Sequence, residues 1–410
     1  MKHKFAAAPV AALLVAMAVG QAIGAESKAT PFKLGTFQAQ GRDYVGLVLR
    51  DTVVIDVAAA NAQYERTHAS DKKLRFPSDL KEVIARYDGE FGPRLRQLAA
   101  ANESVQSAAY IRNIDGVKIL PPVRPAIILN AGANYPEHAA GIVQQNARAA
   151  AAGAAPGGPP AGAGAPAGAG GPPGAGGPPG AGVPPGAGGP PGAGGPPRAG
   201  ATTAPGIWER APGDARPDNP YLFLKSPTTV VGARDDVMVP RGREQIDWEC
   251  EFAVVVGKPA KNVPVSSAAD YVFGYSIEFD VSDRGGRNDR KMGGGPDWLI
   301  QKNHDTFGPI GPFIVPKEFV PQPTNVRHYF MLNGEIKQDS NTGRMEYNLW
   351  EMLSYASNIM TLSPGDMLSL GSPAGTNIER ANPRWMKAGD VGTCIVEGIG
   401  EQKHNIVATP

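Results

Sequence analysis

The sequence contains little cysteine or histidine and has no dominant charge. Its 410 residues include two cysteines and six histidines, and 40 lysines and arginines balance 39 acidic residues. The basic residues are scattered, so no positive stripe is available to neutralise the phosphates of a nucleic acid. The cysteines and histidines show no spacing typical of a zinc site. We therefore expect neither nucleic-acid binding nor zinc, while small neutral or acidic ligands remain open.

The N-terminus lacks an apolar run long enough to predict a membrane-spanning helix. It reads MKHKFAAAPVAALLVAMAVGQAIGAES, with two early lysines, an apolar run over 5–19 and then small residues. This order is typical of a secretory signal peptide. We predict a cleaved signal over 1–25, a periplasmic or secreted protein, and no stable membrane anchor.

The two cysteines, Cys250 and Cys394, lie far apart in the sequence. An oxidising compartment would permit them to pair, but the spacing gives no information on their geometry. Two buried thiols on strands are the favoured interpretation, and pairing stays open.

The segment 30–115 is typical of a small α+β domain. LGTFQ, YVGLVLR and VVIDV predict three short strands over 34–38, 44–50 and 53–57. Ser78 is a candidate cap for a helix over 79–87, and RLRQLAA repeats apolar residues at helical spacing.

The composition changes to alanine, glycine and proline over 147–205. Between Gly168 and Gly195 a glycine recurs at every third residue, interrupted by Val183. A collagen-like stalk needs this repeat, but the run is short and has additional glycines. We predict a disordered insert rather than a trimeric stalk.

From Tyr221 onward the sequence predicts mainly β-structure. IDWECEFAVVVG and YVFGYSIEFDVS indicate two long strands, Asn333-Gly334 a hairpin turn, and 349–359 an amphipathic helix. The turns at 364–366 and 388–390 precede further short strands. The fold class is therefore mixed and mainly β, a barrel or roll with peripheral helices.

Three carboxylates form a candidate metal site. Glu249 and Glu251 are two residues apart, so on a strand they point to the same face. Asp280 follows the next predicted strand. A solvated edge strand is the alternative, but the apolar FAVVVG after Glu251 indicates an interior strand. Adjacent buried carboxylates repel unless a cation binds them, and oxygen ligands favour Mg²⁺, Mn²⁺ or Ca²⁺.

The order of several motifs resembles the fumarylacetoacetate hydrolase family. These motifs are NYPEHAAG, YLFLKSPTTVVG, DWECEFAVVVGK, GYSIEFDVSDRGGR, QKNHDTFGPIGPF, LNGEIKQ, TLSPGDMLSLGSPAG and MKAGD. They cover almost all of 125–405 outside the insert, and the first segment resembles the small domain that precedes many catalytic domains of this family. The resemblance implies a β-roll catalytic domain over 120–410, interrupted by the insert, and a homodimer.

The resemblance also assigns roles to residues of this chain. It implies a divalent metal on Glu249, Glu251 and Asp280, and substrates with a 2-oxo acid or 1,3-dicarbonyl group. Further matching positions are a base at His138, a catalytic lysine at Lys302, and candidate substrate contacts at Arg284, Ser372 and Lys225. For Lys225 a structural role is an equal alternative.

Three departures from the family pattern surround the catalytic base rather than the metal ligands. In a subgroup of relatives a glutamate three residues after the histidine orients its ring, whereas this chain has Gly141. Asp283 and Gly285 flank the arginine where relatives have alanine and aspartate, and His304 replaces an aromatic residue. Glu379, after GSPAG, is a candidate for the missing acid.

Three functions remain in competition. The leading hypothesis is a hydrolase that cleaves a carbon–carbon bond in a 2-oxo or 1,3-dicarbonyl acid of the fumarylacetoacetate or acylpyruvate type. The second is a decarboxylase or a tautomerase of a 2-oxo acid. The third is a diverged metal- or ligand-binding protein without turnover.

Overall fold

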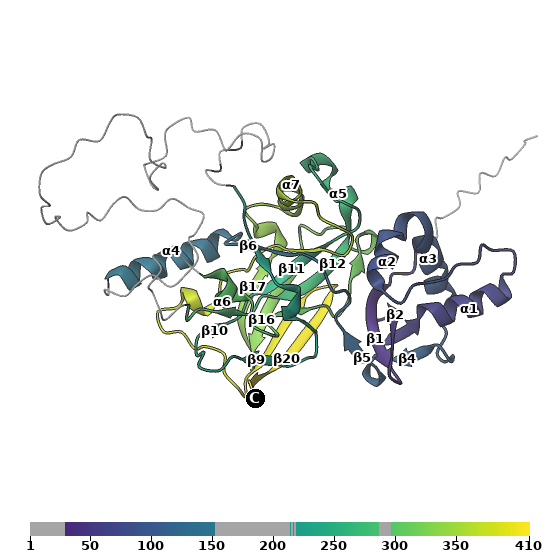
Figure 1. Ribbon diagram of the computed structural model, residues 1–410, viewed down its shortest axis with the longest axis horizontal. Helices are drawn as coiled ribbons and strands as arrows, with labels where there is room; N and C mark the ends of the chain where they lie inside the picture. Colours follow the sequence, from purple (N-terminus) through teal and green to yellow (C-terminus); the bar gives the residue numbers. More distant parts are fainter. Residues whose placement is uncertain (1–28, 152–213, 215, 217–218, 287–296) are drawn as a thin grey trace, which may run out of the picture.

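The computed structural model describes residues 29–151, 214, 216, 219–286 and 297–410. The predicted signal peptide and most of the predicted insert lie outside these residues. Figure 1 shows a small N-terminal unit, in purple, beside a larger unit built mainly of strands. Within the described residues no helix has the length and apolar character needed to cross a membrane.

The N-terminal unit is a curved antiparallel sheet that carries three helices. The three predicted strands are present as β1, β2 and β3, and the sheet order is β4-β3-β2-β1-β5. Its elements are β1 (Lys33–Ala39), β2 (Arg42–Leu49), β3 (Val53–Asp56), α1 (Val57–Thr67), α2 (Leu80–Ala85), α3 (Gly92–Ala101), β4 (Ile111–Asn113) and β5 (Lys118–Leu120). Because β5 pairs with β1, this sheet extends past residue 115 to Leu120.

Two details of the helices differ from the prediction. The side chain of Asp79, not Ser78, caps α2, since it accepts a hydrogen bond from the backbone N–H of Lys81 at 2.8 Å. Helix α1 was not predicted; Asp56 caps it, at a position read as strand.

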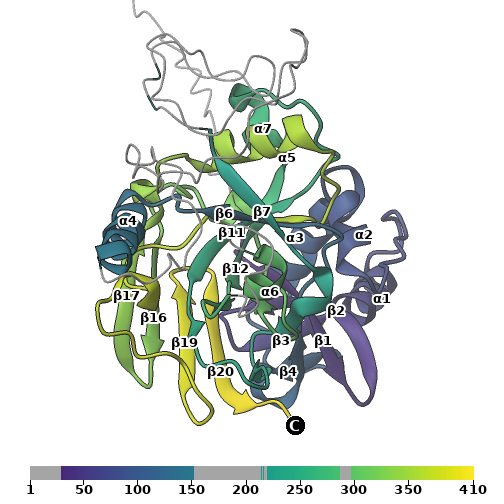
Figure 2. The same cartoon turned by 60° about the vertical axis from the view of Figure 1, so that its left-hand side comes forward.

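The larger unit consists mainly of two facing sheets with helices at the rim (Figure 2). The first sheet has the order β7-β6-β18-β11-β12-β14-β8, with β15 also paired to β12, and the second has the order β17-β16-β19-β20-β9. This arrangement confirms the mainly β fold class. The strands are β6 (Ile128–Gly132), β7 (Tyr221–Lys225), β8 (Val230–Gly232), β9 (Val237–Val239), β10 (Ile246–Asp247), β11 (Cys250–Val256), β12 (Val272–Phe279), β13 (Ser282–Asp283), β14 (Gly308–Ile310), β15 (Val315–Pro316), β16 (Arg327–Leu332), β17 (Glu335–Asn341), β18 (Met367–Ser369), β19 (Val391–Val396) and β20 (Gly400–Ala408).

The predicted turns and the predicted helix of this unit are confirmed. Asn333 and Gly334 join β16 to β17, and both have positive φ angles, as this tight hairpin turn requires. Helix α7 occupies Leu349–Ile359 and begins with a capping box formed by Asn348 and Glu351. The remaining helices are α4 (Pro136–Ala151), α5 (Ala268–Tyr271) and α6 (Trp298–Lys302). Because α4 ends at Ala151, the first five residues of the predicted insert are helical.

The two long predicted strands are each broken near the candidate metal ligands. The first divides into β10 and β11, and the second into β12 and β13. The small ladder of β10 with β13 is separate from the main sheet that contains β11 and β12. Glu249 and Asp280 therefore lie where the chain leaves the main sheet, which frees their side chains to converge.

The space between the facing sheets is filled by a continuous apolar core. Trp248, Phe279 and Phe330 are fully buried in it, and their rings stack in sequence. A second core joins the N-terminal unit to the outer side of β11, β12 and β18. A bridge between Leu34 and Ile314 links the two units through two backbone hydrogen bonds. The first sheet is thus covered on both faces, which supports a buried polar site within it.

The expectation of two free thiols is wrong. Cys250 on β11 and Cys394 on β19 form a disulfide, with a separation of 5.4 Å between their Cα atoms. The sequence could not provide this distance because it results from the packing of one sheet on the other.

The disulfide predicts a definite thiol count, because the chain has two cysteines. Purified protein that is denatured without reductant and treated with iodoacetamide should take up no carbamidomethyl group. The same protein should take up two groups after reduction. Mass spectrometry measures both values, and two groups without reductant would contradict the pairing.

Candidate functional site

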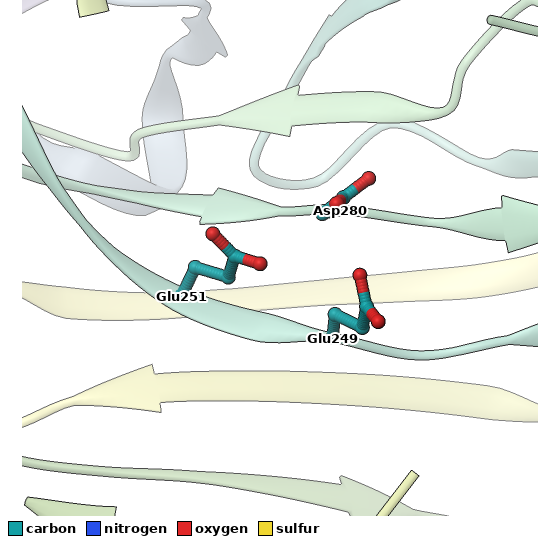
Figure 3. Close-up of side chains that lie close together, drawn as sticks. All are labelled: Glu249, Glu251 and Asp280. Atoms are coloured by element: carbon teal, nitrogen blue, oxygen red, sulfur yellow. The ribbon is translucent and has the colours of Figure 1, made fainter. Parts of the chain in front are cut away.

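Three buried carboxylates converge at the break between the two ladders. One oxygen from each of Glu249, Glu251 and Asp280 lies within 4.8 Å of the other two. The three side chains project into one shared space, the glutamates from one chain segment and Asp280 from the neighbouring segment (Figure 3). All three are at most 4 % exposed. The sequence prediction that these residues come together is therefore confirmed.

Buried cations contact Glu249 and Asp280, two of the three carboxylates. The Nζ atom of Lys302 donates to Glu249 Oε2 and to Asp280 Oδ2, both at 2.6 Å. The guanidinium of Arg284 donates to Glu249, and it also contacts Asp247 at 3.1 Å. Lys225 Nζ lies 2.5 Å from Asp280 Oδ1.

Lys225 differs from the other two cations in where it directs its remaining protons. Its ammonium donates to the backbone carbonyls of Phe307 at 2.6 Å and Val281 at 3.2 Å. These bonds tie three separate segments together beneath Asp280. Of the two roles that the sequence left open for Lys225, the arrangement favours the structural one over a substrate contact.

The sequence analysis missed two further buried carboxylates. Asp247 accepts backbone hydrogen bonds from Asn377 and Ile378, at 2.8 and 3.1 Å. Glu278 lies opposite Glu251 in the β11–β12 ladder and accepts from Asn130 Nδ2 at 2.9 Å. Each lies two residues before a predicted ligand, so the period-two alternation of a strand could have indicated both.

The charges around the triad fit a divalent cation. Five fully or almost fully buried carboxylates face three buried cations, which leaves an excess of two negative charges when every group is ionised. These groups are Asp247, Glu249, Glu251, Glu278 and Asp280, against Lys225, Arg284 and Lys302. An uncompensated buried charge is costly, so the site requires either protons or a cation with two positive charges. Oxygen donors of this kind suit Mg²⁺, Mn²⁺ or Ca²⁺.

The carboxyl groups differ in how strongly they bind protons. Burial, together with the charges of Asp280 and Glu249, raises the pKa of Glu251 well above its usual value. Burial, again with the charge of Glu249, also raises the pKa of Asp280, and the pKa of Glu278 rises to about 7. Burial opposes ionisation of Glu249 as well, but Arg284 and Lys302 outweigh it and lower its pKa. Glu251 and its neighbours therefore bind protons more readily than ordinary carboxylates do, and a cation would compete with these protons.

His138 lies beside the triad and is oriented by Glu379. Its Nδ1 atom contacts Glu379 Oε1, while its Nε2 atom lies 3.8 Å from Glu249 Oε1. Glu379 is held by the backbone N–H of Gly375 at 2.9 Å and by the Thr376 hydroxyl at 2.7 Å. The candidate acid named from the sequence thus reaches the histidine from a different segment of the chain.

The tautomer of His138 follows from these contacts. Burial tends to raise the pKa of Glu379, but the hydrogen bond and charge of His138 outweigh this effect and lower it. An ionised carboxylate only accepts hydrogen bonds, so Nδ1 of His138 must be the donor. The lone pair of neutral His138 then lies on Nε2, on the side of the metal ligands.

Gly141 is what makes room for this arrangement. A Cβ atom at position 141 would lie 2.6 Å from Cγ of Glu379. Gly375 has a φ of +111°, and a Cβ there would lie 2.1 Å from the carbonyl oxygen of Lys337. Gly141 and Gly375 therefore permit the approach of Glu379 to His138. A glutamate at position 141, as in the subgroup of relatives, would take the space that Glu379 occupies.

A small cavity brings the predicted residues together. Its lining includes His138, Glu249, Arg284, Lys302 and Ser372. The Ser372 hydroxyl is 2 % exposed and accepts a hydrogen bond from Gln338 Nε2 at 2.8 Å. A larger cavity, of about 490 Å³, lies along the other side of α4 and has none of these residues in its lining.

The other two departures from the family pattern meet in space. His304 Nε2 lies 3.3 Å from Asp283 Oδ2, and Arg243 also donates to this carboxylate. Asp283 additionally accepts from the backbone N–H of Gly285 at 2.9 Å. This cluster joins the segment of Arg284 to the segment of Lys302.

Comparison with known proteins identifies a matching family model and relatives of similar sequence. Residues 199–407, about half of the chain, match the family model described as "Fumarylacetoacetate (FAA) hydrolase C-terminal". The oxaloacetate tautomerase fahd2 of Xenopus laevis is 36% identical over 191 residues, which are 47% of this chain and 59% of that protein. The oxaloacetate tautomerase Fahd2a of Rattus norvegicus is 38% identical over 184 residues, which are 45% and 58% of the two chains. This chain thus spans less than two thirds of the length of these curated relatives.

Solved structures share the fold over 92% of the chain. One is a maleylpyruvate hydrolase from Sphingobium sp. SYK-6 in complex with manganese(II) and pyruvate, with a TM-score of 0.57, 21% identity and complete coverage of that chain. Another is a fumarylacetoacetate hydrolase from Exiguobacterium antarcticum, with a TM-score of 0.58, 22% identity and complete coverage of that chain. The similar proteins include hydrolases, isomerases and tautomerases. With its acidic triad and the match to the family model, the chain belongs to the fumarylacetoacetate hydrolase family.

Proposed function

We propose that this protein is a divalent-metal-dependent hydrolase that cleaves a carbon–carbon bond in a small 2-oxo or 1,3-dicarbonyl acid. The observation that carries the proposal is the direction of His138 Nε2 toward the carboxylate triad, with Glu379 behind Nδ1. A base oriented in this way, beside a metal site, suits the activation of water. A solved structure of the same fold that holds manganese and pyruvate supports Mn²⁺ or Mg²⁺ as the metal.

The residues of the chain divide the work of hydrolysis. An ion bound by the triad would polarise the oxo group of the substrate and stabilise negative charge on its oxygen. His138 Nε2 takes a proton from water as the water oxygen attacks the carbonyl carbon, and Glu379 stabilises the imidazolium. The carbon–carbon bond breaks, its electron pair remains on the 2-oxo fragment, and His138 returns the proton there. Lys302 and Arg284 supply positive charge in the cavity for the substrate carboxylate.

A second candidate is tautomerisation of a 2-oxo acid. The relatives at 36% and 38% identity that are named oxaloacetate tautomerases favour it. In this reaction His138 would move a proton between carbon and oxygen without a water molecule. Assays of acylpyruvate cleavage and oxaloacetate tautomerisation, each with and without Mg²⁺ and Mn²⁺, separate the two. Metal binding without turnover of either substrate would favour a ligand-binding protein.

We also propose export and a homodimer. Export is supported by the disulfide, because such bonds persist in oxidising compartments. The dimer follows from the family resemblance.

The His138–Glu379 pair gives the first prediction for this function. Both His138→Ala and Glu379→Gln should lower kcat by at least about 100-fold, because one removes the base and the other replaces the carboxylate that stabilises its imidazolium with a neutral amide. Neither should abolish Mn²⁺ binding. The matched control is Glu137→Gln, which changes a carboxylate adjacent to His138 that instead pairs with Arg344. Full activity of Glu379→Gln would contradict the proposed dyad.

Gly141 gives the second prediction. Gly141→Ala should displace the Glu379 side chain and lower kcat, with little effect on metal affinity, since the added methyl contacts Glu379 Cγ. The double variant Gly141→Glu, Glu379→Gly places the carboxylate one helical turn after His138, on the same helix face. It should be more active than Glu379→Gly alone. Wild-type kcat in Gly141→Ala would show that the close approach is unimportant.

Metal binding gives the third prediction. Because the pKa values of Glu251 and Asp280 are raised in the metal-free protein, a cation competes with protons there. Mg²⁺ or Mn²⁺ binding should therefore release protons, and affinity should fall as the pH is lowered. Calorimetry in two buffers with different ionisation enthalpies measures the proton count. A metal affinity that does not change with pH, without proton release, would contradict this prediction. The variant Glu251→Gln should bind metal much more weakly than the wild type.

A further inference from the structure

Cys250 lies between the metal ligands Glu249 and Glu251. Its backbone N–H, its backbone C=O and its sulfur each have a bonding partner. In the β11–β12 ladder it faces Phe279, and the adjacent Glu249 carbonyl accepts the bond from Asp280 N–H. In this alternating pattern the N–H and C=O of Cys250 point away from β12. The pairing of β11 with β18 begins at Ala253, so within the part of the chain that the structure describes no strand adjacent to β11 in its sheet takes these two groups.

The facing sheet supplies the missing partners. Gln338 Oε1 accepts from Cys250 N–H at 3.1 Å, and His328 Nδ1 lies 3.0 Å from the Cys250 carbonyl oxygen. Cys394 binds the sulfur of Cys250 covalently. These partners come from β17, β16 and β19, three strands of one sheet, and none is more than 1 % exposed. The link between the two glutamates is thus fixed from the second sheet.

The same side chains extend to other parts of the site. Burial lowers the pKa of His328 to about 4, so the ring is neutral and donates from Nδ1 to the carbonyl. Its Nε2 then accepts from the hydroxyl of Tyr135, three residues before His138, at 2.8 Å. Gln338 Nε2 donates to Ser372 Oγ at 2.8 Å. Residue 250 is therefore joined to the helix of the base and to the loop of Ser372.

We propose that the Cys250–Cys394 disulfide is a positioning element of the metal centre, which raises its affinity for divalent cations by holding Glu249 and Glu251 at coordination spacing. The inference rests on metal binding by the triad, a part of the proposed function, and is independent of the substrate. Coordination sites lose affinity when the groups that orient their ligands are removed. Of the three interactions that fix Cys250, the disulfide is covalent, whereas the two hydrogen bonds break and reform.

The first test removes the link but leaves the ligand segment unchanged. Cys394→Ala should weaken Mn²⁺ binding by about tenfold or more, measured by calorimetry on the full chain. The matched control is Val396→Ala, two residues further on β19, on the same face and in the same core. It removes core volume without a link to Cys250 and should bind Mn²⁺ like the wild type. Thermal unfolding in EDTA records the loss of stability of each variant separately.

The second test uses the wild-type protein and does not require the variant to fold. A dithiol buffer reduces the disulfide by transferring two electrons and two protons: the S–S bond breaks, two thiols form, and the dithiol closes to its own disulfide. If the disulfide raises the affinity for metal by some factor, thermodynamic linkage requires bound metal to raise the equilibrium constant for disulfide formation by the same factor. Saturating Mg²⁺, which binds thiols poorly, should therefore shift this equilibrium toward the disulfide. Alkylation and mass spectrometry measure the shift.

The outcomes separate this inference from the proposed function. Weaker Mn²⁺ binding in Cys394→Ala, together with protection of the disulfide by Mg²⁺, supports it. Three results would overturn it while leaving the metal centre intact. These are equal Mn²⁺ affinity in Cys394→Ala and the wild type, an equal loss of Mn²⁺ affinity in Val396→Ala, and a thiol–disulfide equilibrium that Mg²⁺ does not shift. If the wild type bound neither ion, the proposed function would lose its metal and this inference would fail with it.

Discussion

The structure depends on the burial of five carboxylates beside only three cations. Asp247, Glu249, Glu251, Glu278 and Asp280 are at most 4 % exposed, and their excess negative charge is compatible with a folded protein only if protons or a divalent cation balance it. This requirement explains why Lys225, Arg284 and Lys302 are buried as well. It also explains why the backbone donates to Asp247 and Glu251 from the segments that follow β18.

The architecture places these charges where the β-ladders are interrupted. At Glu249 and Asp280 the chain leaves the main sheet, so side chains from two neighbouring segments can converge without a continuous ladder between them. Core packing covers both faces of this sheet, the N-terminal unit on one side and the second sheet on the other. The charged side chains of the site are therefore largely excluded from solvent, and electrostatic interactions between them are strong.

The orientation of His138, the proposed base, depends on a contact between segments that are far apart in the sequence. Helix α4 has a glycine where an acid would orient His138, and the loop after β18 fills that space with Glu379. In the same loop Ser372 accepts a hydrogen bond from Gln338, whose amide oxygen accepts from the N–H of Cys250 between Glu249 and Glu251. His138, the loop after β18 and the segment of Glu249 and Glu251 are consequently connected by hydrogen bonds and are not independent of one another.

Patterns of residues close together in the sequence were sufficient to predict much of the fold and of the candidate site. Period-two alternation placed Glu249 beside Glu251, turn residues located the β16–β17 hairpin, and helical periodicity gave the bounds of α7. Motif order identified the family resemblance and with it the role proposed for His138. These features depend on residues that are close in sequence, whose geometry is set by backbone stereochemistry.

Tertiary structure alone decided the features that join distant segments. The pairing of Cys250 with Cys394 follows from the packing of two sheets, and the sequence favoured free thiols instead. The contact between Glu379 and His138 spans 241 residues, and the sequence offered it only as one candidate. The excess of negative charge appeared only once Asp247 and Glu278 were seen to be buried with the triad. The sequence thus determined which groups are candidates for the chemistry, whereas packing determined which of them meet, because such distances depend on how the whole chain folds.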